Sequence, residues 1–233
     1  MKNKFITIIP ARGGSKSIPL KNIQLLNNKP LISYSIEYSQ KCPLVSHTVV
    51  STDSKRIAKI AKDFNAEIPF LRPCEISQDK TKDFPVINHA LKLLEDIYGK
   101  QIDVIIWLRP TSPLRPEGLI EKAIAILESN PSCTSIRSVV KSKEHPYRQW
   151  FLTDNFIKSV VGEASYNEPY NIPRQDLPDS YFQSGDIEVI KRNTILSGSI
   201  SGDKIIPLII KQNEMLDIDH FSDLTKAEKK ISE

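Results

Sequence analysis

The sequence predicts an α/β fold in which a mostly parallel sheet lies between two layers of helices. Along residues 5–140, short apolar runs alternate with segments in which apolar positions recur at helical spacing. This alternation is typical of strand–helix–strand units, which build parallel sheets. The run at residues 104–108 is apolar at every position, as expected for a strand that helices cover on both faces. A chain of 233 residues suffices for one large domain.

Each expected element has a local reason. Strands are expected where β-branched and other apolar residues cluster, at 5–9, 48–52, 67–71, 103–108, 133–140, 187–190 and 205–210. Helices are expected where apolar residues share one face, at 30–42, 54–64, 84–98, 116–128 and from 221 onward. Gly99 is placed to stop the third helix, and Pro116 to start the fourth.

The alternation breaks between residues 141 and 180, where prolines are frequent. Two short strands, around 149–152 and 156–161, are expected to pair through a turn at Asp154 and Asn155. The segment is rich in aromatic residues, namely Tyr147, Trp150, Phe151, Tyr166 and Tyr170. We therefore expect a single domain, residues 1–233, with residues 141–180 inserted as a β-rich arm that binds a second copy of the chain and contributes to the substrate site.

Composition narrows the classes of function. The 32 basic and 28 acidic residues give a formal net charge of +4, and the basic residues are scattered, so nucleic acid is not an expected partner. No apolar run is long enough to span a membrane, and no signal-peptide pattern opens the chain. The three cysteines lack CxxC spacing, so we expect reduced, packing side chains. A cytoplasmic protein is the expectation.

The loop after the first strand has the composition of an anion site. Ligands of open α/β sheets bind beyond the carboxyl ends of the strands. Residues 10–16 contain two adjacent glycines flanked by Arg12 and Lys16, and Lys21 follows. A Walker A loop would need Gly where Ser15 stands, and the GxGxxG pattern also fails. The loop predicts a polyphosphate site of another kind; the plainer alternative is a tight turn with solvated basic neighbours.

Two carboxylates near the carboxyl end of the chain are candidates for a metal site. Asp217 and Asp219 are separated by one residue, so in an extended segment they share one side. Oxygen ligands of this kind suit Mg²⁺, which takes one or two carboxylates and keeps several waters. Alternatively, Asp219 caps the final helix.

Seven short motifs lie in order along the chain, at residues 9–16, 21–23, 51–53, 72–73, 110–115, 174–175 and 217–219. With these motifs the whole chain resembles the acylneuraminate cytidylyltransferase family, which includes the CMP-sialic acid synthetases and is related to the CMP-Kdo synthetases. The resemblance implies a Rossmann-like nucleotidyltransferase sheet and a homodimer. It also implies Mg²⁺-dependent transfer of CMP from CTP to a sialic-acid-like 3-deoxy-2-ulosonic (nonulosonic) acid, with release of pyrophosphate, for cell-surface glycan biosynthesis.

The resemblance assigns roles to individual residues. Catalytic roles go to Arg12, Lys16, Lys21, Asp217 and Asp219, and the two aspartates would hold Mg²⁺. The nucleotide would contact Ala11, Arg12, Gly13, Gly14, Ser15, Asn22 and Arg72. The sugar acid would contact Arg109, Thr111, Ser112, Arg174, Gln175, Gln183, Gly185 and Asp186. Arg174 would meet the sugar carboxylate across a dimer, because a guanidinium pairs with a carboxylate through two hydrogen bonds. Arg115 is expected at the surface or in the dimer contact.

The chain departs from the family pattern at positions that bear on the acceptor. Ser17 stands where sialic acid enzymes have Gly, and Arg109 stands where they have Gln. Exchanging Gln for Arg adds a cation and removes an acceptor, which favours an acceptor sugar with an extra anionic or carbonyl group. Asp186 and Glu188 add carboxylates where the family has mostly neutral residues. Asp186 either faces the site, binding an amino-substituted sugar or joining the metal, or faces away as an ordinary carboxylate.

Two other functions stay open at this point. The first keeps nucleotidyl transfer but uses a sugar 1-phosphate or another phosphorylated acceptor, which the positive charge of Arg109 would favour. The second is a nucleotide-binding homologue without catalysis, which the presence of Arg12, Lys21 and the aspartate pair disfavours.

Overall fold

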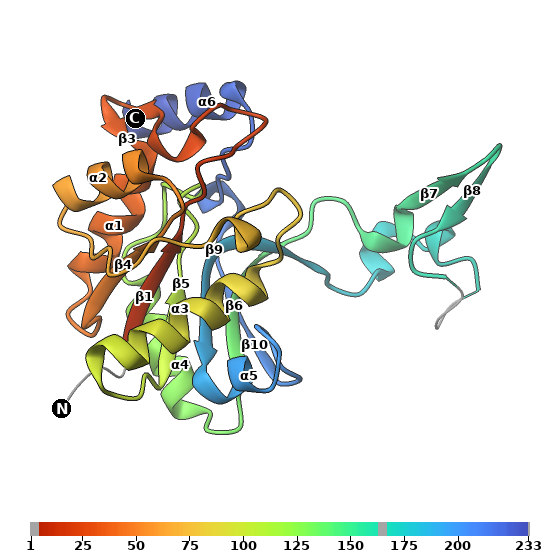
Figure 1. Cartoon of the computed structure of the whole chain (residues 1–233). Coiled ribbons are helices and arrows are strands. Elements are labelled where there is room, and N and C mark those ends of the chain that lie inside the picture. The colour runs from red at the N-terminus through yellow and green to blue at the C-terminus, as the bar shows by residue number, and fades with distance from the viewer. Residues whose placement is uncertain (1–4, 163–166, 233) are drawn as a thin grey trace.

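The computed structural model describes residues 5–162 and 167–232 (Figure 1). Within them the central sheet has six strands in the order β10-β6-β9-β5-β1-β4. Their bounds are β1 Phe5–Pro10, β4 His47–Ser51, β5 Val104–Trp107, β6 Ser135–Lys141, β9 Tyr181–Lys191 and β10 Ile205–Ile209. Strand β1 is parallel to β4 and β5, and β10 is parallel to β6. Strand β9 is antiparallel to both its neighbours, β5 and β6. The predicted mostly parallel sheet is confirmed.

Helices cover both faces of this sheet, which confirms the predicted three layers (Figure 1). Their bounds are α1 Leu31–Lys41, α2 Lys55–Asp63, α3 Asp83–Tyr98, α4 Leu119–Ser129 and α5 Arg192–Leu196. Phe5 and Ile9 of β1 pack with α1, α2 and α4, whereas Ile6 and Ile8 pack with α3 and α5. Side chains alternate along a strand, so one apolar run serves two cores.

A third apolar cluster holds the carboxyl-terminal segment near the loop that follows β1. It joins α6 (Phe221–Ser232) to the small sheet of β2 (Leu25–Leu26) and β3 (Lys29–Pro30). Its buried members are Ile18, Leu26, Leu31, Ile218, Leu224 and Ala227. Because Ile218 is fully buried, the aspartates on either side of it are anchored next to the glycine loop.

Two expected elements differ in the structure. The strand expected at 67–71 is reduced to a single parallel bridge between Val49 and Glu67, because the chain turns away toward Arg72 after that pair. The fourth helix begins at Leu119 and not at Pro116, because Gly118 adopts a left-handed conformation with φ 70°. In the described part of the chain, none of the helices has the length and apolar character needed to cross a bilayer.

The segment between β6 and β9 projects from the body as an arm (Figure 1). Its neck is closed by a hydrogen bond from Ser142 N to Ser180 O. Further out, β7 (Trp150–Thr153) and β8 (Phe156–Ser159) form the predicted hairpin, with Asp154 in the left-handed region at φ 50°. Tyr166, one of the aromatic residues noted above, lies outside the described residues.

Candidate active site

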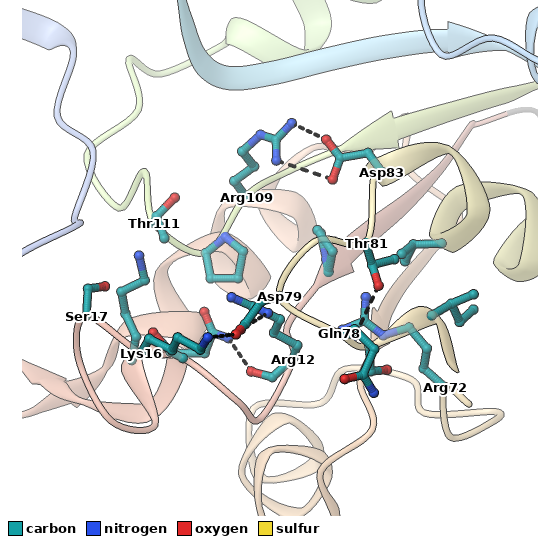
Figure 2. Close-up of a pocket in the computed structure, with 18 of the residues that line it drawn as sticks. Arg12, Lys16, Ser17, Arg72, Gln78, Asp79, Thr81, Asp83, Arg109 and Thr111 are labelled. Atoms are coloured by element: carbon teal, nitrogen blue, oxygen red, sulfur yellow. Dashed lines mark hydrogen bonds and ion pairs between the residues drawn. The ribbon is translucent and has the colours of Figure 1, made fainter. Parts of the chain in front are cut away.

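A cavity of about 460 Å³ opens at the carboxyl edge of β1, β4 and β5 (Figure 2). Residues from both ends of the chain line it, which explains why the motifs are spread so widely in sequence. Of the residues expected to bind nucleotide, substrate or metal, those that line it are Arg12, Ser15, Lys16, Lys21, Asn22, Arg72, Arg109, Thr111 and Asp219. The structure thus brings together the basic loop after β1, the loop before α3, the loop after β5 and the segment before α6.

The glycine loop is held from behind by the end of β4. The Gly13 amide donates to Asp53 Oδ1 at 2.9 Å, and a Cβ on Gly13 would come within 3.0 Å of Ser54 Cβ. Gly13 therefore allows close packing of the loop, and its amide is already used, contrary to the expectation that it would face an anion. Gly14 lies beside open space. The Asn22 side chain donates to Arg12 O at 3.0 Å and so fixes the loop from its other end.

Asp79 joins two of the cations in this loop (Figure 2). Its Oδ1 lies 2.6 Å from Arg12 Nη1, and its Oδ2 lies 2.5 Å from Lys16 Nζ. Lys16 and then Arg12 hold the pKa of the Asp79 carboxyl below its usual range. Asp79 remains ionised at neutral pH, and a residue that the sequence did not single out thereby enters the site.

Lys21 ties the glycine loop to the aspartate segment. Its Nζ donates to Ile218 O and to Asp219 Oδ1, both at 2.9 Å. The same segment is held on its other side, because Ile218 N donates to Thr111 O at 2.8 Å. Desolvation by the surrounding protein raises the pKa of Asp217; Thr111 opposes this rise, and the charge of Asp219 adds to it. The expected alternative for Asp219 as a helix cap is wrong.

The start of α6 is held instead by Asp223, the third residue of the helix. Its Oδ2 accepts from His220 N at 2.9 Å and from Asp219 N at 3.2 Å. These bonds fix the backbone just before α6, and the Asp219 side chain lines the cavity, as the sequence interpretation required.

Arg72 is buried against the cavity with only 6% of its surface exposed. Its Nε and Nη2 have no hydrogen-bond partner among the described residues, whereas its backbone amide donates to Thr52 O at 2.8 Å. Burial lowers the pKa of Arg72, Asp53 opposes this shift and Arg12 adds to it. Buried donors without a hydrogen-bond partner are unfavourable, and an anionic or polar ligand that accepts from Nε and Nη2 would relieve this cost.

Arg109 is neutralised by two carboxylates, Asp83, which Figure 2 shows beside it, and Glu188. Its Nη2 lies 2.5 Å from Asp83 Oδ2 and 3.1 Å from Glu188 Oε1. Burial acts to lower the pKa of Arg109, but the charges and hydrogen bonds of Asp83 and Glu188 outweigh burial and raise that pKa above its usual value. Glu188 also pairs with Arg137 at 3.0 Å, and Arg137 donates to Gln183 Oε1 at 2.7 Å. The network contains two cations and two anions, so Arg109 offers no uncompensated charge to an acceptor.

Arg115 is a buried residue, and its expected position at the surface or in a dimer contact is wrong. It donates to Asp186 O and to Arg109 O, both at 2.6 Å, and to Ser35 Oγ at 2.9 Å. Burial lowers its pKa to about 10, and the charge of Asp186 opposes that shift. Because Arg115 fixes the carbonyl of Arg109, it shapes the cavity wall from behind.

Several residues expected at the sugar acid, and one expected at the nucleotide, do not line the cavity. Asp186 is fully buried, and burial raises the pKa of its carboxyl. Ser112 is 1% exposed, and Gly185, at φ 76°, packs beside the Arg109 side chain. Ala11 is also buried, and its amide continues the pairing of β1 with β4 by donating to Ser51 O at 2.9 Å. These residues support the wall and do not face its interior.

Arg174 and Gln175 lie on the arm, in the short helix η5 (Arg174–Asp176). Both are exposed, and neither lines the cavity of its own chain. Gln183 lies at the base of the arm on β9 and is held by Arg137.

The carboxylates that the sequence interpretation missed share one signal. Asp53 directly follows β4, and Asp79 and Asp83 lie in or just after the loop that leads from Arg72 to α3. Asp53 belongs to the motif at residues 51–53 but was given no role of its own. All three carboxylates lie at the carboxyl edge of the sheet, where ligands of such folds bind.

A glycine loop with several cations and a pair of aspartates, at the carboxyl edge of an open α/β sheet, defines the site of a nucleotidyltransferase. The sequence model of the Cytidylyltransferase family matches residues 6–197. The chain belongs to this family.

Relatives and solved structures agree with this assignment. The chain is 31% identical over 233 residues to Post-translational flagellin modification protein B of Campylobacter coli, covering 99% of this chain and 96% of the relative. It is also 31% identical to the CMP-N,N'-diacetyllegionaminic acid synthase of Campylobacter jejuni, and the match covers 98% of this chain and 95% of that synthase. A solved structure of CMP:2-keto-3-deoxy-manno-octonic acid synthetase complexed with CTP matches with a TM-score of 0.72 over 98% of both chains; at 14% identity, this likeness shows the fold.

Proposed function

We propose that this enzyme transfers CMP from CTP to a sialic-acid-like 3-deoxy-2-ulosonic acid and releases pyrophosphate, for the synthesis of cell-surface glycans. The observation that carries the proposal is the buried guanidinium of Arg72, whose Nε and Nη2 have no hydrogen-bond partner among the described residues, in a cavity shared with Arg12, Lys16 and Lys21. One of the relatives is a CMP-N,N'-diacetyllegionaminic acid synthase, and the family match, residues 6–197, includes all the residues named above that line the cavity except Asp219. Since CTP is a cytoplasmic nucleotide, we propose the same compartment for the reaction.

In the proposed reaction a hydroxyl oxygen of the sugar forms a bond to the α-phosphorus of CTP, and the bond from that phosphorus to the β-phosphate oxygen breaks. The leaving group is pyrophosphate. Phosphoryl transfer depends mainly on positioning and on stabilising negative charge. Arg12, Lys16 and Lys21 would hold the phosphate chain, and Arg72 would donate to the nucleotide from its buried position.

The donor set of the site fits Mg²⁺. Asp219, which lines the cavity, and Asp217, which does not, would provide two hard oxygen ligands, and the described residues contain no group of three or more potential metal-ligating side chains. A site with two carboxylates suits Mg²⁺, which fills its other positions with water and phosphate oxygens. When bound, the ion would offset negative charge on the reacting phosphates. Lys21 would keep Asp219 oriented for this role.

The acceptor is proposed to bind beside Arg109 and Thr111. Arg109 and Asp83 each expose 30% of their side chains, so this wall presents donors and carboxylate acceptors together. Such a surface suits neutral polar substituents, because hydroxyl and amide groups can both donate and accept hydrogen bonds. A phosphorylated acceptor gains no support, because the charge of Arg109 is already balanced by Asp83 and Glu188.

The proposal is tested by pyrophosphate release from each nucleoside triphosphate with Mg²⁺, against a panel of nonulosonic acids, Kdo and sugar 1-phosphates. We expect turnover with CTP and a nonulosonic acid, with little or none from sugar 1-phosphates. Turnover with sugar 1-phosphates alone would contradict the proposed acceptor. Tight CTP binding without turnover on any acceptor would instead favour a non-catalytic nucleotide-binding protein.

We further propose that the arm, residues 141–180 of the single domain, joins two copies of the chain. Phe151, Leu152, Phe156 and Ile157 are between 58% and 79% exposed on the hairpin. Exposed apolar surface of this kind marks a protein interaction site. In a dimer with two-fold symmetry each arm reaches the partner. Arg174, which lies outside the cavity of its own chain, would then meet the sugar carboxylate in the partner's site.

Replacing Leu152 with aspartate is expected to convert the dimer into a monomer, because a charge would enter the proposed apolar contact. Light scattering after size exclusion should give twice the mass of one chain for the wild type and the single mass for Leu152→Asp. The matched control is Leu44→Asp, which places the same charge on a residue 46% exposed outside the arm and should stay dimeric. A wild-type monomer, or a dimeric Leu152→Asp, would contradict the proposed role of the arm.

A further inference from the structure

Asp79 occupies the place of an anionic ligand in the nucleotide cavity. Its two carboxylate oxygens face Arg12 and Lys16 at 2.6 and 2.5 Å. Two oxygens of a phosphate group would meet the same two cations in a similar way. The cations proposed to bind the triphosphate are therefore already engaged by the protein when no nucleotide is present.

The segment that carries Asp79 is a small turn between two anchored ends. Gln78 N donates to Thr81 Oγ1 at 3.0 Å, and Thr81 N donates to Gln78 O at 3.1 Å. On its far side Asp83, the first residue of α3, is held by Arg109. The turn can thus move at its tip while α3 stays in place.

The contacts of Asp79 are of a kind that a ligand can replace. The side chains of Arg12 and Asp79 are 33% and 34% exposed, and that of Lys16 is 84% exposed. Ion pairs with this exposure are weak because water and salt screen them. A triphosphate carries several negative charges, so it competes well for both cations. Once it is bound, like charge would repel the Asp79 carboxylate from the phosphates.

We propose that Asp79 is a built-in competitor of the polyphosphate chain. It holds Arg12 and Lys16 in the empty site, leaves them when CTP binds, and returns to them as pyrophosphate departs. It thereby limits the affinity of the site for polyphosphate anions and favours release of the leaving group. The proposal rests on the function proposed above, because it assigns these cations to the phosphates of CTP.

The test is calorimetric titration of pyrophosphate and of CTP into wild type and Asp79→Asn, at low ionic strength and without divalent cations. The substitution keeps the shape of the side chain and removes its charge. We expect Asp79→Asn to bind both ligands about threefold to tenfold more tightly, the range set by two exposed ion pairs. Inhibition by pyrophosphate should strengthen by a similar factor. The matched control is Glu75→Gln, which removes a charge from an exposed residue nearby that does not line the cavity.

Unchanged or weaker pyrophosphate binding by Asp79→Asn would overturn the proposal, as would an equal gain in Glu75→Gln, which would indicate a general effect of net charge. A second variant, Asp79→Ser, is measured in parallel so that a folding defect in one variant does not decide the result. The titrations with pyrophosphate separate this proposal from the proposed function. If Asp79→Asn strengthens pyrophosphate binding but the wild type does not bind CTP, the competitor role stands and cytidylyl transfer fails.

Discussion

Replacing Lys21 with methionine is expected to lower kcat/KM for CTP by about 10²–10³, the usual cost of removing one donor that stabilises charge in a transition state. Lys21 is 14% exposed and donates to both Ile218 O and Asp219 Oδ1. The change would remove a cation from the phosphate site and release the aspartate proposed to hold Mg²⁺. Steady-state pyrophosphate release measures the effect.

The control for this prediction is Lys29→Met. Lys29 lies outside the cavity and forms an exposed ion pair with Glu37 at 2.8 Å, so its loss should leave kcat/KM close to the wild-type value. If Lys21→Met kept near-wild-type activity while its fold was intact, Lys21 would be only a link between the glycine loop and the carboxyl-terminal segment. A rise in the Mg²⁺ concentration needed for activity would instead support its role in orienting Asp219.

Replacing Arg72 with methionine is expected to change two quantities in opposite directions. CTP binding should weaken by about 100-fold, because each hydrogen bond from a charged group contributes about 1.5–3 kcal/mol. The protein without nucleotide should become more stable, by about 1 kcal/mol, because a buried guanidinium with two nitrogens that lack hydrogen-bond partners is replaced by an apolar side chain of similar length. Calorimetric titration with CTP and urea unfolding without nucleotide measure the two effects.

Arg56, which is exposed on α2, provides the matched control, and Arg56→Met should change neither quantity. A third variant, Arg72→Lys, keeps the charge but loses the planar array of donors, so it should restore only part of the CTP affinity. Loss of stability in Arg72→Met together with unchanged CTP binding would show that Arg72 serves the fold and not the nucleotide.

Much of the fold followed from periodicity, because buried strands and amphipathic helices leave strong local patterns. The failures arose where tertiary context decides. Residues 67–71 have the composition of a strand, but only Glu67 finds a partner at the sheet edge. Pro116 is a good first residue of a helix, yet Gly118 sets the true start through its left-handed backbone. The reversal of β9 is also not visible in its own sequence, since an apolar run has no direction.

The candidate site was predictable to the extent that its residues lie in recognisable motifs. The ion pairs between residues that are far apart in sequence could not be predicted in this way. The expectation that Arg109 favours an anionic acceptor loses its physical basis, because Asp83 and Glu188, far away in sequence, neutralise Arg109. Arg115 was expected near the surface because most arginines lie there, whereas three acceptors satisfy it in the interior. Residue types and spacing indicate chemistry, but the partners of each charge come only from the folded chain.

The position of the arm between β6 and β9 has a consequence for how such enzymes can vary. These strands are adjacent and antiparallel, and the Ser142–Ser180 bond closes the neck, so the entire arm is in effect an oversized hairpin loop. The entropy of closing a loop grows only slowly with its length. The arm can therefore lengthen, shorten or change its surface over generations while the register of the sheet stays the same.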